Sequence, residues 1–143
     1  MIKRISPEKF LEMFKYVPRV AVDLIIKNKK GEVLLSKRNI TPGVGKWHLP
    51  GSFIMLNETI GECIKRITHV ELGFDLKKEN LKFLGIFENL DGDPRGHVID
   101  LIYEIKVINI DKLSPTDEAM EIKFFKDMPI IGFKHDKILK KYL

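Results

Sequence analysis

The stretch GSFIMLNETIGECIKRITHVELGF, residues 51–74, predicts a helix with one unusual position. A stripe of apolar side chains repeats at helical spacing along it, formed by Ile60, Ile64 and Ile67. The next position on that stripe is Glu71, a carboxylate where the pattern favours another apolar residue. Glu71 also falls in the last turn, where the helix dipole disfavours an anion by a few tenths of a kcal/mol.

Two interpretations of Glu71 remain open at this point. A divalent cation beside the carboxylate would compensate both its burial and its place at the end of the helix. Alternatively, the side chain extends past the last turn into water. Asn57 is a favoured N-cap residue and Gly73 suits the position after the last turn, so we expect the helix to run over Glu58–Leu72.

The flanking segments predict a mixed α+β domain in which a helix packs on a sheet. Pro and Gly mark residues 39–52 as a loop. β-rich runs predict strands at 19–28, 33–38, 81–88, 96–108 and 120–125. Capping and apolar spacing predict further helices at 6–17 and 135–143.

Length and composition restrict the class of protein. The 143 residues are expected to form a single domain over 1–143, since that length is enough for one core. The net charge of +5 is spread along the chain, which favours a solvated surface over a nucleic-acid patch. No apolar run is long enough to span a membrane, and no signal peptide is evident, so we expect a cytoplasmic protein that binds neither membrane nor nucleic acid.

The order of residues across 45–74 resembles the signature of the Nudix hydrolases, G-x5-E-x7-R-E-U-x-E-E-x-G-U, where U is aliphatic. The positions that match it are Glu58, Arg66, Glu71, Gly73 and Phe74. Ser52 stands at the first Gly, while Ile67 and Val70 replace two acids of the usual metal cluster. The resemblance, with its signature at 51–74, implies a Nudix fold with a mixed β-sheet packed between helices.

Within that family, the depleted acid cluster is most similar to that of the GDP-mannose mannosyl hydrolases, which also keep only the last acid. The resemblance implies a Mg²⁺ site, which Mn²⁺ would also fill, held by Glu71, the carbonyl of Gly51 and Glu118. It also implies that Asp23 and Arg38 contact the substrate.

Two positions depart from that subgroup. Phe53 replaces an Arg that binds the substrate's phosphates, and Ala119 replaces the His that serves as general base. Arg95, in a segment that is similar to part of the ADP-ribose-type Nudix proteins, is a substitute phosphate contact. Trp47 is expected either to stack on a base or to anchor its loop.

The catalytic candidates are Glu118, Glu58 and Arg66. Glu118 is the preferred base, with Glu58, Glu62 and His97 as alternatives. Arg66 either orients the metal-binding acid or faces solvent.

Three functions follow as hypotheses. The first is a Mg²⁺-dependent hydrolase of a nucleoside diphosphate linked to another group, with a nucleotide sugar such as GDP-mannose as substrate. The second is a pyrophosphatase for ADP-ribose or another nucleotide. The third is a Nudix-fold module that binds a nucleotide with little turnover, and a homodimer is compatible with all three.

Overall fold

The computed structural model describes residues 4–74, 80–107 and 116–143, and it contains a mixed sheet of seven strands. The strands are β1 (Arg19–Lys27), β2 (Val33–Arg38), β3 (Trp47–His48), β4 (Gly51–Phe53), β5 (Asn80–Asn89), β6 (Val98–Lys106) and β7 (Ala119–Phe125). Five of them follow the order β3-β2-β1-β6-β5, while β4 pairs with β1 and β7 pairs with β2. The expected mixed α+β arrangement is therefore confirmed.

Strand β1 lies at the centre of the sheet and runs parallel to β6 from Arg19↔Val98 to Lys27↔Lys106. Its residues 21–26 are all buried, because both faces of the sheet are covered at this strand. An acid within this run, Asp23, is buried with the apolar residues.

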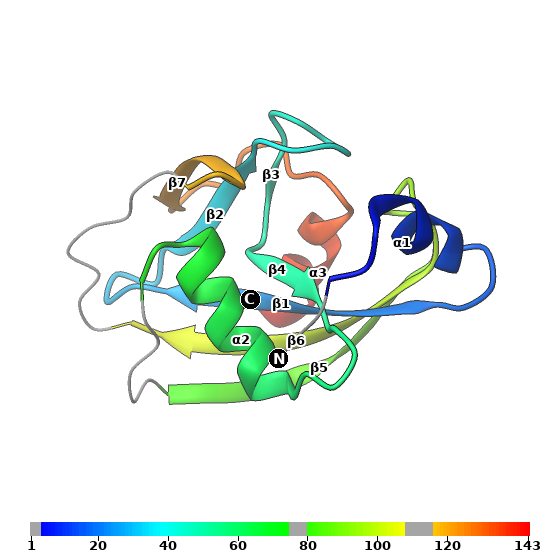
Figure 1. Cartoon of the computed structure of the whole chain (residues 1–143). Coiled ribbons are helices and arrows are strands. Elements are labelled where there is room, and N and C mark those ends of the chain that lie inside the picture. Colours follow the sequence, from blue (N-terminus) through cyan, green and yellow to red (C-terminus); the bar gives the residue numbers. More distant parts are fainter. Residues whose placement is uncertain (1–3, 75–79, 108–115) are drawn as a thin grey trace.

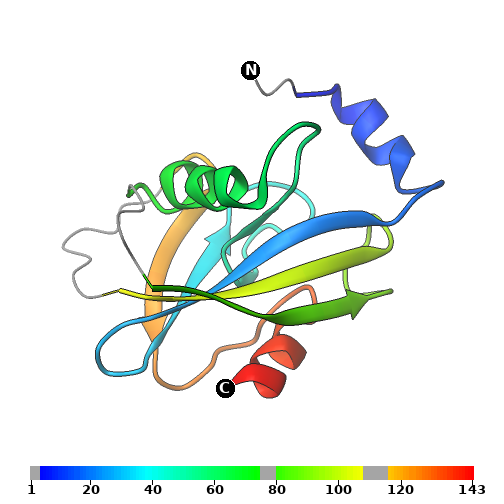
Figure 2. The same cartoon turned by 90° about the horizontal axis from the view of Figure 1, so that it is seen from below.

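Helices cover the two faces of the sheet, as Figures 1 and 2 show. On one face lies α2 (Ile60–Arg66), which continues as a π-helical turn, η1 (Ile67–Glu71). On the other lies α3 (His135–Tyr142), while α1 (Pro7–Met13) sits to one side of the sheet. In the part of the chain that the structure describes, no helix has the length and apolar character needed to cross a membrane.

Two apolar clusters fill the space between the helices and the sheet. The cluster under α2 consists of Val22, Leu24, Ile26, Leu34, Cys63, Ile64, Ile67, Leu72, Ile105 and Val107. The cluster under α3 consists of Ile25, Val33, Leu35, Leu49, Ile102, Ile138 and Leu139. Alternation along β1 sends successive side chains to opposite faces, which is why this strand supplies both clusters.

Several predicted boundaries differ from the observed ones. The predicted loop 39–52 contains β3 and the start of β4, short strands whose Pro and Gly neighbours hide them in the sequence. The first helix ends at Met13 instead of near Val17 and continues only as turns. Ile108, the last residue of the predicted strand 96–108, lies outside the described residues.

The start of the main helix was also misplaced. Thr59, not Asn57, is the N-cap, and its side chain accepts from the N–H of Glu62 while the Glu62 carboxylate accepts from the N–H of Thr59. Asn57 instead adopts a positive φ of 64° in the preceding turn. The reciprocal cap satisfies two backbone donors at once, and it sets the first helical residue at Ile60.

Strand β4 is inserted where β1 and β2 separate. Strand β2 pairs with β1 at Lys27↔Val33, whereas β4 pairs with β1 at Ala21, Val22 and Asp23. The segment from His48 to Gly51 therefore enters the middle of the fold beside β1, and its backbone lies close to the end of η1.

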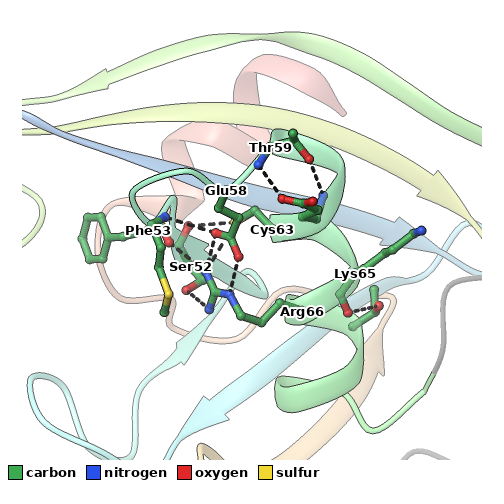
Figure 3. Close-up of polar contacts among 10 residues, drawn as sticks. Ser52, Phe53, Glu58, Thr59, Cys63, Lys65 and Arg66 are labelled. Carbon is green, nitrogen blue, oxygen red and sulfur yellow. Dashed lines mark hydrogen bonds and ion pairs between the residues drawn. The ribbon is translucent and has the colours of Figure 1, made fainter. Parts of the chain in front are cut away.

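A charged latch joins β4 to α2 (Figure 3). Arg66 donates from Nε and Nη2 to the two carboxylate oxygens of Glu58, at 2.8 and 3.0 Å. It also donates from Nη1 to Oγ of Ser52 and from Nη2 to the carbonyl of Phe53, both at 2.9 Å. Glu58 accepts a further bond from the N–H of Met55. The latch thereby fixes the turn between β4 and α2 from both sides.

We predict that Arg66→Met lowers the free energy of unfolding by about 2–4 kcal/mol, because it leaves the Glu58 carboxylate buried without its cation. Urea denaturation monitored by circular dichroism measures this loss. Lys65→Met is the matched control, since Lys65 lies on the same helix with an exposed side chain. Equal stability of the two variants would show that the latch does not hold the fold.

Candidate active site

Glu71 points into the protein, with 4% of its surface exposed. Its Oε2 accepts a hydrogen bond from the N–H of Gly51 at 3.1 Å, and its Oε1 lies 3.8 Å from Nε2 of His48. The second interpretation of the sequence, a side chain that escapes to water, is therefore wrong. The residue closes a π-helical turn, a geometry found often at functional sites.

The surroundings of Glu71 disfavour its charged form. Burial raises the pKa of its carboxyl to about 8, the Gly51 N–H opposes that rise, and the nearby Glu118 carboxylate adds to it. The carboxyl is therefore largely protonated at neutral pH in the protein without a cation. A divalent cation would convert it to the carboxylate by supplying the missing positive charge.

Glu118, the second predicted metal ligand, is brought toward Glu71 from the other end of the sequence. The backbone carbonyl of Glu118 accepts a hydrogen bond from the N–H of Asn39 at 3.1 Å. Two residues earlier in the chain, the hydroxyl of Thr116 donates a hydrogen bond to the carbonyl of Glu71 at 3.1 Å. These bonds fix the start of β7 against the end of η1. The Glu118 carboxylate raises the pKa of Glu71, so the two predicted ligands are electrostatically coupled, and Gly51 reaches Glu71 through its backbone N–H.

A second pair of acids lies beneath Gly51. Burial, and then the neighbouring Asp100, raise the pKa of Asp23 well above its usual value, and burial raises that of Asp100. One carboxylate oxygen of each, Oδ2, is buried and lacks a hydrogen-bond partner among the described residues. A Cβ on Gly51 would overlap Oδ1 of Asp23 and stand 2.7 Å from the Val22 carbonyl, so only Gly fits against β1 at this position.

Two buried histidines that the sequence did not single out complete the centre. Nδ1 of His48 lies 2.7 Å from the carbonyl of Leu49, so this nitrogen carries the proton and Nε2 presents its lone pair toward Glu71. Nδ1 of His135 accepts from the N–H of Leu49 at 3.0 Å, so its Nε2 carries the proton and faces Oδ2 of Asp23 at 3.9 Å.

Burial keeps both imidazoles neutral. The pKa of His48 is lowered to about 4 and that of His135 to about 3, in each case chiefly by loss of water. Neither histidine has a partner at a spacing typical of a metal site, which is why sequence reasoning passed over them. The only signal was their position: His48 precedes the Leu-Pro-Gly segment, and His135 opens the last helix.

Arginines line the edge of the acidic centre. Arg38, at the end of β2, donates to the carbonyls of Pro42 and Thr41 and stacks on Phe133 at 5.4 Å. Burial, and then the charge of Arg95, lower the pKa of Arg38, whereas the carboxylate of Glu71 acts in the opposite direction and raises it. Arg95 forms a two-point ion pair with Asp93, at 2.9 and 2.8 Å. The two predicted phosphate contacts therefore lie close enough to repel each other.

Other predicted site residues take part in packing. The ring of Trp47 meets Phe125 edge-on at 4.8 Å and packs on the cluster under α3, which favours the anchoring alternative. Glu58 and Arg66 bind each other in the latch, and Arg66 is the main cause of the lowered pKa of Glu58. A carboxylate with a lowered pKa is a weak base, so this geometry favours a positioning role for both.

The donor set fits one class of metal ion. In the described ranges, no group of three or more His, Cys, Asp or Glu side chains is close enough to enclose an ion. Mg²⁺ is commonly held by one or two carboxylates together with water and substrate phosphates, which matches Glu71 and Glu118. The buried, largely protonated carboxyl of Glu71 is the ligand whose burial such an ion would compensate.

We predict that the metal-free protein loses stability as the pH rises from 6.5 to 8. The folded state binds the Glu71 proton more tightly than the unfolded state, whose pKa is near 4.5, so deprotonation above that value favours unfolding until the folded pKa of about 8 is passed. His48 and His135 act in the opposite direction: their imidazoles titrate near pH 6.5 in the unfolded state, so the last part of their effect falls above pH 6.5 and offsets part of the decline. The expected net loss is about 1 kcal/mol.

The measurement is urea denaturation in EDTA at several pH values. Glu71→Gln should make the decline shallower, since only the contribution of the other buried acids, Asp23 and Asp100, remains. Glu121→Gln, at an exposed position on β7, should decline like the native protein. Parallel curves for native and Glu71→Gln would show that Glu71 is already ionised in the fold.

Several known proteins are similar to this chain in sequence or in fold. A model of the NUDIX domain matches residues 17–136. The chain is 37% identical over 145 residues to the ADP-ribose pyrophosphatase of Methanocaldococcus jannaschii, covering 99% of this chain and 83% of that protein. It is 30% identical over 129 residues to the low-salt glycan biosynthesis protein Agl8 of Haloferax volcanii, covering 86% and 80%.

Among solved structures, the NUDIX domain of Shewanella oneidensis NrtR complexed with ADP ribose superposes with a TM-score of 0.73. The match covers 96% of both chains at 18% identity, so it speaks for the fold alone. The family match over 17–136 and the two relatives at 30% identity or more settle the family. The chain belongs to the Nudix family.

Proposed function

We propose that this protein is a metal-dependent pyrophosphatase that cleaves the diphosphate of ADP-ribose or a similar nucleoside diphosphate derivative. The observation that carries the proposal is the buried carboxyl of Glu71, held by the Gly51 N–H and surrounded by further acids. Such an arrangement is unfavourable without a cation. The similarity to the Methanocaldococcus jannaschii ADP-ribose pyrophosphatase supports this choice of substrate.

Glu71 and Glu118 would hold the Mg²⁺, and the carbonyl of Gly51 is the third ligand that the family resemblance suggests. When bound, the ion would neutralise charge on the diphosphate and lower the pKa of a bound water. The protein's contribution is to hold the two carboxyls in place: the Gly51 N–H fixes Oε2 of Glu71, and the Thr116 bond ties the Glu118 loop to the end of η1.

Arg38 and Arg95 would bind the phosphate oxygens at the edge of the centre. Arg38 is anchored by the carbonyls of Pro42 and Thr41 and by the face of Phe133, so its remaining donors are held in one orientation. The remaining donors suit a diphosphate, which offers several charged oxygens as acceptors. Asp23, buried beneath Gly51, would support the centre from below instead of contacting the substrate at the surface.

Glu118 remains the proposed base for the attacking water. Glu58 is bound by Arg66, and Glu62 is engaged with the N–H of Thr59, so these two of the three alternatives are already committed to structure. Ala119, which replaces the general-base His of the resembling subgroup, is fully buried and pairs with Arg38 of β2. If Glu118 also binds the metal, turnover should be slow.

A nucleotide sugar such as GDP-mannose is the second candidate substrate. The depleted acid cluster, with only Glu71 retained at its end, is the observation that favours it. The likeness to the Haloferax volcanii glycan biosynthesis protein gives it limited support.

The test is a substrate panel with Mg²⁺ or Mn²⁺ and identification of the products. We expect ADP-ribose to give AMP and ribose 5-phosphate, two phosphorylated products that indicate attack at phosphorus. Release of free mannose and GDP from GDP-mannose would instead indicate attack at carbon and support the second candidate. Nucleotide binding without any product would support a binding module.

The variant Glu71→Gln should lower kcat by about 100-fold or more on the best substrate, because it removes a charged metal ligand. Glu121→Gln, on the exposed side of β7, should keep native kcat. Native turnover in Glu71→Gln would contradict the assignment of the metal site.

A further inference from the structure

Three phenylalanine rings, those of Phe10, Phe14 and Phe53, meet edge to face at one side of the sheet; we term them the phenylalanine cluster. Their centroids lie 5.4–5.5 Å apart, with interplanar angles of 68–80°. Phe10 is part of α1 and Phe14 caps it, whereas Phe53 ends β4. The cluster therefore connects α1, which Figure 2 shows beside the sheet, to the strand that carries Gly51.

Two arginines stack on the phenylalanine cluster. The guanidinium of Arg19 lies 4.8–5.6 Å from the three ring centroids, and that of Arg95 lies 5.1–5.9 Å from the same rings. Stacking uses the faces of the guanidinium groups and leaves their N–H donors free for other partners.

The two arginines differ in their acidic partners. Arg95 is neutralised by the two-point ion pair with Asp93. Arg19 makes no ion pair with a described carboxylate, and its Nη1 is out of water with no hydrogen-bond partner among the described residues. Burial, and then the positive charge of Arg95, lower the pKa of Arg19. A buried donor left without an acceptor is destabilising, so this arrangement is suited to an absent anion.

The position of Arg19 links it to the acidic centre. Arg19 begins β1, the strand that carries Asp23, and Phe53 beneath it lies two residues after Gly51 on β4. Arg95 acts on both Arg19 and Arg38, since its charge lowers the pKa of each. The three cations therefore form a connected group at one edge of the proposed metal site.

We propose that Arg19 is a specificity-determining residue that binds a phosphoryl group of the nucleotide, with Arg95 beside it and the phenylalanine cluster as its support. The proposal rests on the proposed function, since it assigns a part of the substrate to this edge of the same site. An oxyanion placed between the two guanidinium groups would relieve their repulsion and supply the acceptor that Nη1 of Arg19 lacks. Helix α1, through Phe10 and Phe14, would then shape the substrate-binding site.

The test is isothermal titration of ADP and of adenosine in EDTA, where no metal-dependent turnover takes place. Arg19→Met should raise the Kd for ADP roughly 10-fold or more, the effect of losing hydrogen bonds to a charged group, and should leave the Kd for adenosine unchanged. Arg19→Lys keeps the charge without the planar fork and should fall between native and Arg19→Met. Arg4→Met, at an exposed position before α1, should bind ADP like the native protein.

Several outcomes would overturn the proposal. Native affinity for ADP in both Arg19 variants would do so, as would an equal loss for ADP and adenosine, or the absence of ADP binding by the native protein. A fall in Tm for Arg19→Met with unchanged ADP affinity in Arg19→Lys would assign Arg19 a purely structural role. Hydrolysis of ADP-ribose by the native protein is measured separately, so the proposed function can fail or stand independently of this result.

Discussion

The hydrogen bond from the Gly51 N–H to the buried carboxyl of Glu71 is the contact on which the site depends. It joins the end of the helix η1 to the strand β4, and it opposes only part of the rise in the pKa of Glu71 that burial causes. The backbone can reach Glu71 here because Gly51 lacks a Cβ, whose place is occupied by Asp23. The insertion of β4 beside β1 and the Glu58–Arg66 latch both serve to hold that backbone in position.

The charged groups around this contact are separated by sign, with acids at the centre and arginines at the edge. Carboxyls that are buried and short of partners gather at the centre, where a cation and water would compensate them. Arginines stand at the edge, where they suit the phosphates of a substrate. In the ligand-free protein this arrangement costs stability, and the apolar clusters under α2 and α3 supply the compensating free energy. Binding of metal and nucleotide should therefore stabilise the fold.

The sequence predicted the parts of the fold that local patterns determine. Ile64 and Ile67 of the predicted stripe form the buried face of the helix, whereas Ile60 in its first turn is exposed, and the odd carboxylate at Glu71 marked the candidate site. It did not reveal β3 and β4, since strands of two and three residues have no periodicity and are defined only by their partners. The roles of His48, His135 and Arg19 depend on burial and on distant neighbours, which one sequence does not display.

We infer that Glu71 holds a proton until a cation replaces it, and this exchange is measured by the release of protons on metal binding. Titration calorimetry of Mn²⁺ in buffers of different ionisation enthalpy counts the protons released per ion bound. Because the pKa of Glu71 is raised to about 8, close to one proton should be released at pH 7 by the native protein, and clearly fewer by Glu71→Gln. Binding of Mn²⁺ by the native protein at pH 7 without proton release would contradict the account.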